Sequence, residues 1–223
     1  YETKVIAGNT FDFVYTHGKA LRDNGISFVS TSNESVENGK VDLNKYKFVD
    51  LIFGEQKETV YQKEYERKKN GVMFRTFTKE LQAKLNNYLA NGGNLFVSGS
   101  YLGTDMFRVK SADSLDMKFA KDKLKYIIAT GWASKNGVVE INNNFNCNLK
   151  TVKFNTELND KIYQVEAPDA INPTKESKTL FRYNDNQFSA GIGYKNEYGV
   201  ISMGFPFETI LGEKDRAEFM KGV

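Results

Sequence analysis

The sequence has very little of the residues from which metal sites and disulfides are built. It contains one cysteine, Cys147, and one histidine, His17, among 223 residues. One cysteine excludes an internal disulfide and any site with several cysteine ligands. One histidine with scattered acidic residues does not have the spacing of a transition-metal site. We therefore expect no metal and no cofactor, and we interpret Cys147 as a spectator thiol.

Long apolar runs and charge of one sign are also missing. No apolar run approaches the ~18 residues of a membrane-spanning helix, so no membrane span is expected. The 31 basic and 28 acidic residues are interspersed and leave a net charge of +3. Because this mixture gives no concentrated positive field for a phosphate backbone, nucleic acid is a poor candidate partner.

Short β-rich runs alternate with helical periodicity in the first half. Helical spacing after the first run ends at Gly25. Apolar residues across 77–89 lie on one helical face, with Thr78 as the N-cap. The polar stretch 55–71 is interpreted as a surface excursion or a frayed helix. Strands alternating with helices predict a parallel sheet. The predicted strands are residues 4–8, 26–30, 46–53 and 94–98.

The second half changes to a β pattern after a predicted helix over residues 114–134. Short turns rich in Asn, Asp and Gly separate its last three β runs, which predicts an antiparallel β-meander. A final helix is expected from residue 216. No linker divides the chain, so we expect a single domain over residues 1–223. The predicted strands are residues 137–142, 151–155, 161–167, 179–184, 188–195 and 198–205.

The strand ends predict where a ligand would bind. Ligands of open α/β sheets bind beyond the carboxyl ends of the strands. A small ligand is therefore expected at this edge. The candidates for lining it are Asp12, Gly54, Glu55, Gly99 and Asp105.

One of these ends has the form of a nucleophile elbow, in which a strand leads into a Gly-x-nucleophile-x-Gly turn and a helix. It is NGGNLFVSGSYLGTDM, residues 91–106. Together with DLIFGEQ, ASKNGVV, APDAI and MGFPFETI, it resembles the class I glutamine amidotransferase-like fold. More closely, these segments resemble a group of secreted Bacteroidetes proteins that carry the label xanthan lyase. The resemblance covers nearly the whole chain.

The resemblance implies an α/β fold with a flavodoxin-like parallel sheet and an added antiparallel β-meander near the C-terminus. It also implies a secreted, periplasmic or cell-surface location. The chain opens without methionine, and we expect it to be a fragment of a longer protein. Neighbouring domains of that protein are then expected partners.

Amidotransferases of this class use a Cys-His-Glu triad, and the resemblance places its positions in this sequence. The elbow position falls on Tyr101, the histidine position on Pro206, and the glutamate position on Glu208. A phenol with an ordinary pKa of about 10 is a poor acyl-transfer nucleophile, and proline offers no base. Amide hydrolysis by the inherited mechanism is therefore excluded.

Two serines could replace the missing thiol. Ser98 and Ser100 flank the elbow, and a serine needs a base within hydrogen-bond reach. His17 is the one histidine available, with Asp12, Asp105 or Glu208 to orient it. In the alternative interpretation both serines satisfy turn amides. His17 would then begin the first helix and stack on Phe11, Phe13 or Tyr15.

Carboxylates could also provide acid and base chemistry. Glu55, Asp105 and Glu208 could crowd one site and raise a pKa, as a glycosidase or lyase requires. A lyase would also need a cation, and the candidates Arg75, Arg108 and Arg182 are scattered along the sequence. The same acids could instead interact with helix N-termini.

The sequence favours a non-catalytic, amidotransferase-like scaffold or ligand-binding domain. The resemblance relates this domain to polysaccharides, so carbohydrate is an expected ligand at the carboxyl ends of the strands. The alternatives are a carbohydrate-active, xanthan lyase-like enzyme and a serine hydrolase using Ser100 and His17. The 17 Phe and 12 Tyr could line a sugar-binding platform, although such rings more often fill the core.

Overall fold

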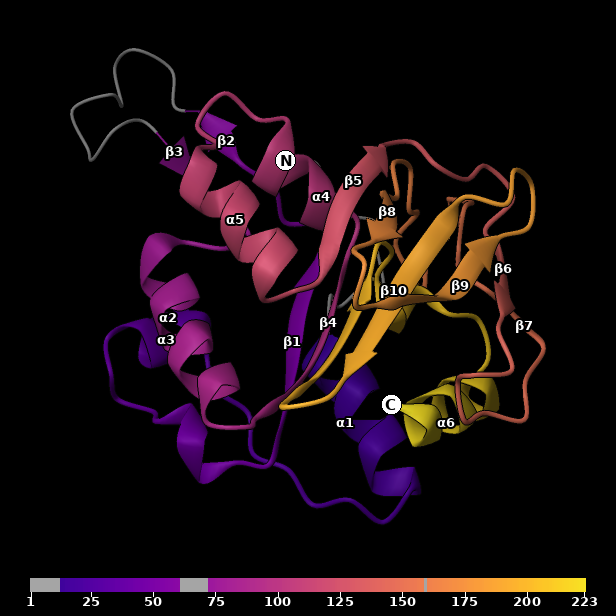
Figure 1. The fold of residues 1–223 in the computed structure, drawn as a ribbon. Coiled ribbons are helices and arrows are strands. Elements are labelled where there is room, and N and C mark those ends of the chain that lie inside the picture. The colour runs from indigo at the N-terminus through magenta and orange to yellow at the C-terminus, as the bar shows by residue number, and fades with distance from the viewer. Residues whose placement is uncertain (1–12, 61–71, 159) are drawn as a thin grey trace.

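A computed structural model describes residues 13–60, 72–158 and 160–223. The described residues form a mixed α/β fold around a curled sheet of seven strands (Figure 1). The predicted strand at 4–8 and the candidate Asp12 lie outside the described residues. In sheet order, the strands are β1 (Phe48–Gly54), β4 (Asn94–Gly99), β11 (Gly199–Met203), β10 (Ser189–Lys195), β9 (Lys178–Tyr183), β6 (Val138–Ile141) and β7 (Thr151–Lys153).

Only one end of this sheet is parallel. β4 pairs in parallel with β1 on one side and β11 on the other, whereas the pairs from β11 to β7 are antiparallel. The predicted β-meander is confirmed as β9, β10 and β11. The prediction of a flavodoxin-like parallel sheet is confirmed only for β1, β4 and β11, because the other strand pairs of the sheet are antiparallel.

The prediction of a strand at residues 26–30 is wrong. The segment has no regular secondary structure, and its apolar residues Ile26, Phe28 and Val29 are exposed. In the described part of the chain, no strand pairs with it. An isolated extended segment has no ladder to satisfy its backbone groups, so an apolar run alone does not make a strand.

Helices cover both faces of the sheet. On one face, α1 (Phe13–Asp23) and α6 (Glu213–Gly222) bury Leu21 and Phe219 against the strands. On the other face, α3 (Lys79–Ala90) and α5 (Ser114–Asp122) bury Leu85 and Phe119. The remaining helical elements are α2 (Asn33–Glu37), η1 (Leu43–Lys45), α4 (Leu102–Phe107) and η4 (Phe207–Thr209).

The helix predicted at 77–89 is confirmed as α3. The Thr78 hydroxyl accepts from the backbone N–H of Leu81, which is the capping bond expected of an N-cap. Gly92, with φ 82°, follows the last turn. In β4, successive apolar residues face opposite sides of the sheet. Phe96 packs on the α1 side and Val97 on the α3 side.

The predicted helix over 114–134 is wrong in its second half. Asp113 caps α5, which ends at Asp122, and Lys125 then takes a left-handed φ of 63°. The β-branched residues that follow form β5 (Tyr126–Thr130), which pairs with β8 (Ala170–Pro173). A separate short hairpin joins β2 (Thr59–Val60) and β3 (Val72–Met73).

The prediction of a strand at 161–167 is also wrong. The side-chain amide of Asn155 donates to the carbonyls of Ile162 and Tyr163. These side-chain bonds take the place of part of a strand ladder, so the segment follows the surface of the sheet irregularly. Among the described residues, no helix is long and apolar enough to cross a membrane.

Candidate functional site

The carboxyl ends of β1, β4 and β11 meet at one edge, as the sequence predicts. The backbone N–H of Ser100 donates to the carbonyl of Gly54 at 2.9 Å, which joins the elbow to the end of β1. Gly99 lies so close to β1 that an added Cβ would be 2.9 Å from Phe53 Cβ. The triad positions Tyr101 and Glu208 both follow strands that end at this edge.

The elbow lacks the backbone strain of a nucleophile turn. Tyr101 precedes α4 with φ −118° and ψ 25°, so its φ is negative and outside the left-handed region. Its ring is half-buried, and the Lys57 ammonium lies 4.7 Å from the ring centroid. Tyr101 therefore makes a cation–π contact at the position that the resemblance assigns to the amidotransferase thiol.

Asp169 occupies the N-terminus of the helix that follows. Its carboxylate accepts hydrogen bonds from the backbone N–H groups of Gly103 and Thr104, at 2.8 and 2.7 Å, and from the Thr104 hydroxyl at 2.7 Å. Burial raises the pKa of Asp169 to about 7. These amides would stabilise a nucleophile's negative charge, but here an internal carboxyl group binds them.

His17 is held between two carboxylates. Its Nδ1 lies 2.7 Å from Asp50 Oδ2, and its Nε2 lies 3.2 Å from Glu208 Oε2. The ring is 2% exposed and packs edge-on against Phe207, 4.6 Å between centroids. Burial alone would lower the pKa of His17, but the charge of Asp50 and hydrogen bonds to both carboxylates raise it to about 9.

The predicted surroundings of His17 are therefore wrong. His17 lies inside α1 rather than at its start, and its ring partner is Phe207. An imidazolium that donates both N–H groups to carboxylates has no lone pair to accept a proton from a serine. His17 here is a buried cation, not a free base.

Glu208 is fixed on its second oxygen as well. The Tyr163 hydroxyl donates to Glu208 Oε1 at 2.7 Å. Gly54, with φ 55°, lies against this pair, and a Cβ there would be 3.1 Å from Oε1. Pro206 caps η4 from inside the core and provides no polar side-chain atom. Glu208, to which the resemblance assigns the triad carboxylate, is thus part of a polar cluster of His17, Asp50, Tyr163 and Glu208, here called the histidine cluster.

The structure does not join the two serines to His17. Ser98 and Ser100 are fully buried, and neither Oγ has a hydrogen-bond partner among the described residues. Asp105 does not orient His17 either. Its carboxylate accepts from the backbone N–H groups of Glu58 and Thr76, and burial raises its pKa to about 6.

Glu55, at the end of β1, is a titratable group whose pKa is raised. Burial, together with the charges of Glu166 and Glu208, raises its pKa to about 7. Its buried Oε1 has no partner among the described residues. One carboxyl group with a raised pKa is a possible proton donor, but a lyase would need a cation beside it.

The three arginines do not supply that cation. Arg75 pairs with Asp116 on α5, Arg108 donates to the Ala129 carbonyl, and Arg182 donates to the Gln187 carbonyl. They are bound to three different elements. Within residues 13–60, 72–158 and 160–223, no group of three or more His, Cys, Asp or Glu side chains could hold a metal ion.

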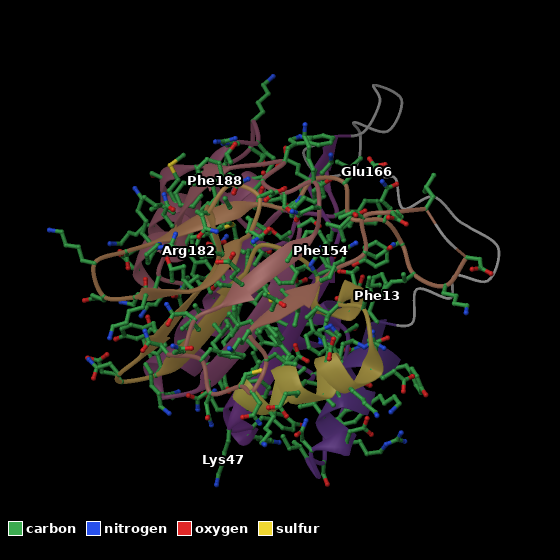
Figure 2. All side chains as sticks on the ribbon, turned by 90° about the vertical axis from the view of Figure 1, so that its right-hand side faces the viewer. Phe13, Lys47, Phe154, Glu166, Arg182 and Phe188 are labelled. Atoms are coloured by element: carbon green, nitrogen blue, oxygen red, sulfur yellow. The ribbon has the colours of Figure 1, made fainter. Side chains whose placement is uncertain are left out.

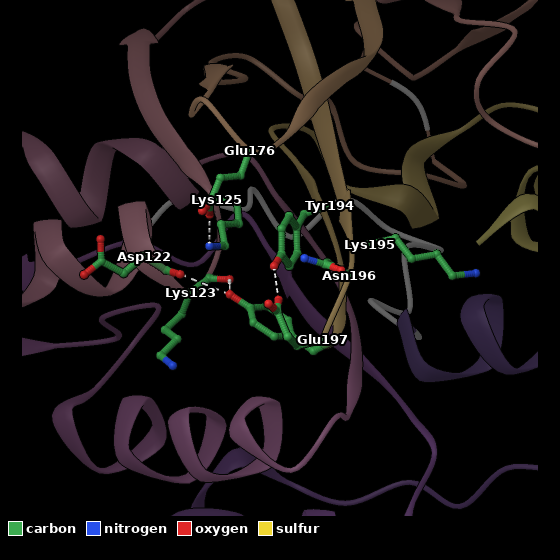
Figure 3. Close-up of a pocket in the computed structure, with 9 residues that line it drawn as sticks. Asp122, Lys123, Lys125, Glu176, Tyr194, Lys195, Asn196 and Glu197 are labelled. Carbon is green, nitrogen blue, oxygen red and sulfur yellow. Dashed lines mark hydrogen bonds and ion pairs between the residues drawn. The ribbon is translucent and has the colours of Figure 1, made fainter.

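Two hollows lie away from the elbow turn. The described residues leave a groove of about 980 Å³ between α1, segment 26–36 and β1, which reaches His17 and Asp50. A polar pocket of about 360 Å³ lies at the β10–β11 turn (Figure 3). In that pocket Lys125 pairs with Glu176 and lies 4.5 Å from the Tyr194 ring centroid.

The polar pocket is largely satisfied by its own residues. The Tyr194 hydroxyl donates to Glu197, and the Tyr198 hydroxyl donates to the carbonyls of Asp122 and Lys123 (Figure 3). These bonds give the pocket a structural role, because its rings and ammonium group bind one another.

Two residues of the candidate site, Asp50 and Asp169, were not predicted from the sequence. Asp50 is an acid inside the apolar run YKFVDLIF, which is a signal that its side chain needs a buried partner. Asp169 lies in the segment APDAI, which carries part of the resemblance, but nothing local to it indicates a helix N-terminus 65 positions away.

Comparison with known proteins shows the fold. No family model matches the sequence, and no curated protein matches it. Among solved structures, the chain is similar to Op5Man5, an exo-β-1,4-mannosidase from Opitutaceae bacterium strain TAV5, with TM-score 0.53 and 10% identity. That similarity covers 95% of this chain and 28% of the mannosidase chain.

Two further structures match along most of their own length. A ThuA-like protein from Parabacteroides merdae ATCC 43184 gives TM-score 0.51 and 9% identity over 97% of this chain and 85% of that chain. A protein described as a GMP synthase subunit from Thermoplasma acidophilum gives TM-score 0.50 and 8% identity over 97% and 90%. The chain therefore shares the α/β fold of these proteins.

Proposed function

We propose that this chain is a non-catalytic, amidotransferase-like domain that serves as a scaffold or ligand-binding module. The observation that carries the proposal is the histidine cluster. Glu208, the one triad residue retained, binds His17 and Tyr163 inside the core. Tyr101 and Pro206 occupy the nucleophile and base positions, and Asp169 binds the helix amides.

The finer part of the proposal is a role in a secreted or cell-surface protein that acts on polysaccharides. Its support is the resemblance of five segments to secreted Bacteroidetes proteins labelled xanthan lyase. A similar fold also forms part of a much longer exo-β-1,4-mannosidase chain. A domain of this kind would position or bind the substrate of a neighbouring catalytic domain.

Release of ammonia from glutamine tests the first part. We expect no release above the buffer blank by the wild-type chain and by Glu208→Gln. We likewise expect no p-nitrophenyl acetate hydrolysis that Ser100→Ala removes. Wild-type turnover that either substitution abolishes would contradict the proposal, and so would formation of unsaturated uronate from xanthan by this chain.

A further inference from the structure

The single tryptophan is the most exposed large apolar side chain in the described part of the molecule. Most aromatic rings pack in the core, as Phe154 does on Phe205 at 5.0 Å between centroids. Trp132, in contrast, is 72% exposed. It follows β5 in the turn before β6. Exposing this much apolar surface forgoes stabilisation that burial would provide.

The backbone of Trp132 is also in an unfavourable conformation. Its φ of 55° is in the left-handed region, which is uncommon for a bulky residue and costs on the order of 1–3 kcal/mol. The next residue fixes this conformation, because the Ala133 N–H donates to the Pro168 carbonyl at 2.8 Å. The turn therefore holds the indole outward at a cost in stability.

A second exposed aromatic lies on a turn tied to the first. Phe188 is 47% exposed, in the β9–β10 turn. The Asn186 side chain donates to the Ala133 carbonyl and accepts from the Phe188 N–H. Asp185 binds the same turn through the N–H of Lys135. One short network thus connects the residues adjacent to both rings.

We propose that Trp132 and Phe188 form a binding surface for a neutral saccharide, here called the aromatic rim. A flat ring that is exposed and rigidly held offers an apolar face to the C–H face of a pyranose. Rigid turns also reduce the entropy lost on binding. The proposal deepens the suggested polysaccharide role and rests on it, although its residues differ from those of the histidine cluster.

The size of the rim favours a saccharide over a protein partner. A stable protein interface buries about 800 Å² on each side. Two aromatic side chains supply at most about 300–500 Å², and both are only partly exposed here. A single sugar ring, in contrast, is of the size of one indole.

The charges around the rim favour a neutral ligand. Lys135 and Asp185 lie on the two turns, and Arg182 on β9 is paired in register with Glu140 on β6, so the charges balance and no net field selects an ion. The rim is also separate from the histidine cluster. Phe188 and Arg182 lie on the opposite side of the view from Phe13, which packs near Gly54 (Figure 2).

Because the chain has one tryptophan, its fluorescence reports on this site directly. The probes are cellohexaose, mannohexaose and xylohexaose, each titrated to about 10 mM, in the range of weak binding. We expect a saturable blue shift of emission with at least one of them. Phe188→Ala should weaken that binding by about three- to tenfold.

Calorimetry with the same sugar tests Trp132 itself. Trp132→Ala should abolish the binding heat, and Trp132→Tyr should restore part of it. Phe74→Ala is the matched control, because Phe74 is also exposed (60%) with a left-handed φ of 53°. Its removal should leave the affinity unchanged.

Three results would overturn the aromatic rim: no saturable shift with any probe, equal loss in the Phe74 control, or concentration-dependent self-association through Trp132. None of them bears on the absence of amide hydrolysis, which the glutamine assay tests separately. An active glutaminase that also binds sugar would contradict the proposed function and leave the rim intact.

Discussion

At the scale of single residues, the charged groups at the strand edge bind one another. The resemblance assigns the triad carboxylate to Glu208 and the triad histidine to Pro206, but the histidine that binds Glu208 is His17, from α1. The imidazole donates to carboxylates on both sides. A residue that would activate a nucleophile elsewhere acts here as the counter-ion of Asp50 and Glu208.

Gly54 is the residue on which the packing of this cluster depends. Gly54→Ala should lower the free energy of unfolding by about 2–4 kcal/mol, because a Cβ would meet both the Phe13 ring and Glu208 Oε1 at φ 55°. Gly25→Ala is the control. Gly25 has φ 73° but nothing within 4 Å, so its loss should be about 1 kcal/mol. Equal losses in urea unfolding would contradict this account.

The strain at Trp132 predicts an opposite effect. Trp132→Gly should leave the free energy of unfolding unchanged or raise it by about 1 kcal/mol, because glycine adopts φ 55° freely and the indole is mostly exposed. Urea unfolding measures the difference. A loss above about 1 kcal/mol would show that the indole stabilises the fold, which weakens the case for a binding role.

At the scale of elements, buried carboxylates join segments that the sheet does not connect. Asp169 fixes α4 to the segment before β8. Asp105, on α4, binds the segments that flank the β2–β3 hairpin through Glu58 and Thr76. The two acids therefore connect the first turn of α4 to two different parts of the chain.

Removing the first of these acids should be costly. Asp169→Ala should lower the free energy of unfolding by about 2–4 kcal/mol, because two buried amides lose their acceptor. Asp113→Ala, which removes an exposed N-cap of α5, should cost about 1 kcal/mol. Hydrogen exchange at Gly103 and Thr104 should accelerate in the first variant alone. Unchanged exchange there would contradict the assigned role of Asp169.

The sequence predicts elements well where capping and periodicity agree. Thr78 and Gly92 bracket α3, and short polar turns define the β-meander. The wrong predictions concern segments whose secondary structure depends on contacts with residues distant in sequence. The run at 26–30 has a strand composition without a strand to pair with, whereas residues 126–130 lie in a helical pattern that Lys125 breaks through its backbone conformation.

The candidate site was predictable only in part, because its members are distant in sequence. His17 and Glu208 are 191 positions apart, and no spacing pattern joins them. The resemblance placed Glu208 at the strand edge, and the edge rule placed His17 near it. The carboxylate on the other side of the ring, Asp50, follows only from the packing of α1 on β1.

At the scale of the whole molecule, His17, Glu55, Asp105 and Asp169 bind protons more tightly in the folded chain. The pKa of His17 rises from 6.5 to about 9, that of Glu55 from 4.5 to about 7, and that of Asp105 from 3.8 to about 6. The pKa of Asp169 rises from 3.8 to about 7. Each contribution is fully present below the unfolded pKa and is lost as the pH rises through the folded pKa.

The fold should therefore lose stability as the pH rises from about 4 to about 9. The acids account for the fall up to about pH 7, and His17 accounts for the fall from about 6.5 to 9. Urea midpoints at pH 5, 7 and 9 measure the slope. His17→Gln should flatten the upper part; a flat wild-type profile would refute the assignment.

The most direct test of the histidine cluster is an NMR titration of the imidazole of His17, the one histidine in the chain. The account predicts a single transition near pH 9, with the ring protonated on both nitrogens at neutral pH. A transition near the ordinary 6.5, or a neutral ring at pH 7, would mean that His17 is free to act as a base, and would contradict the non-catalytic assignment.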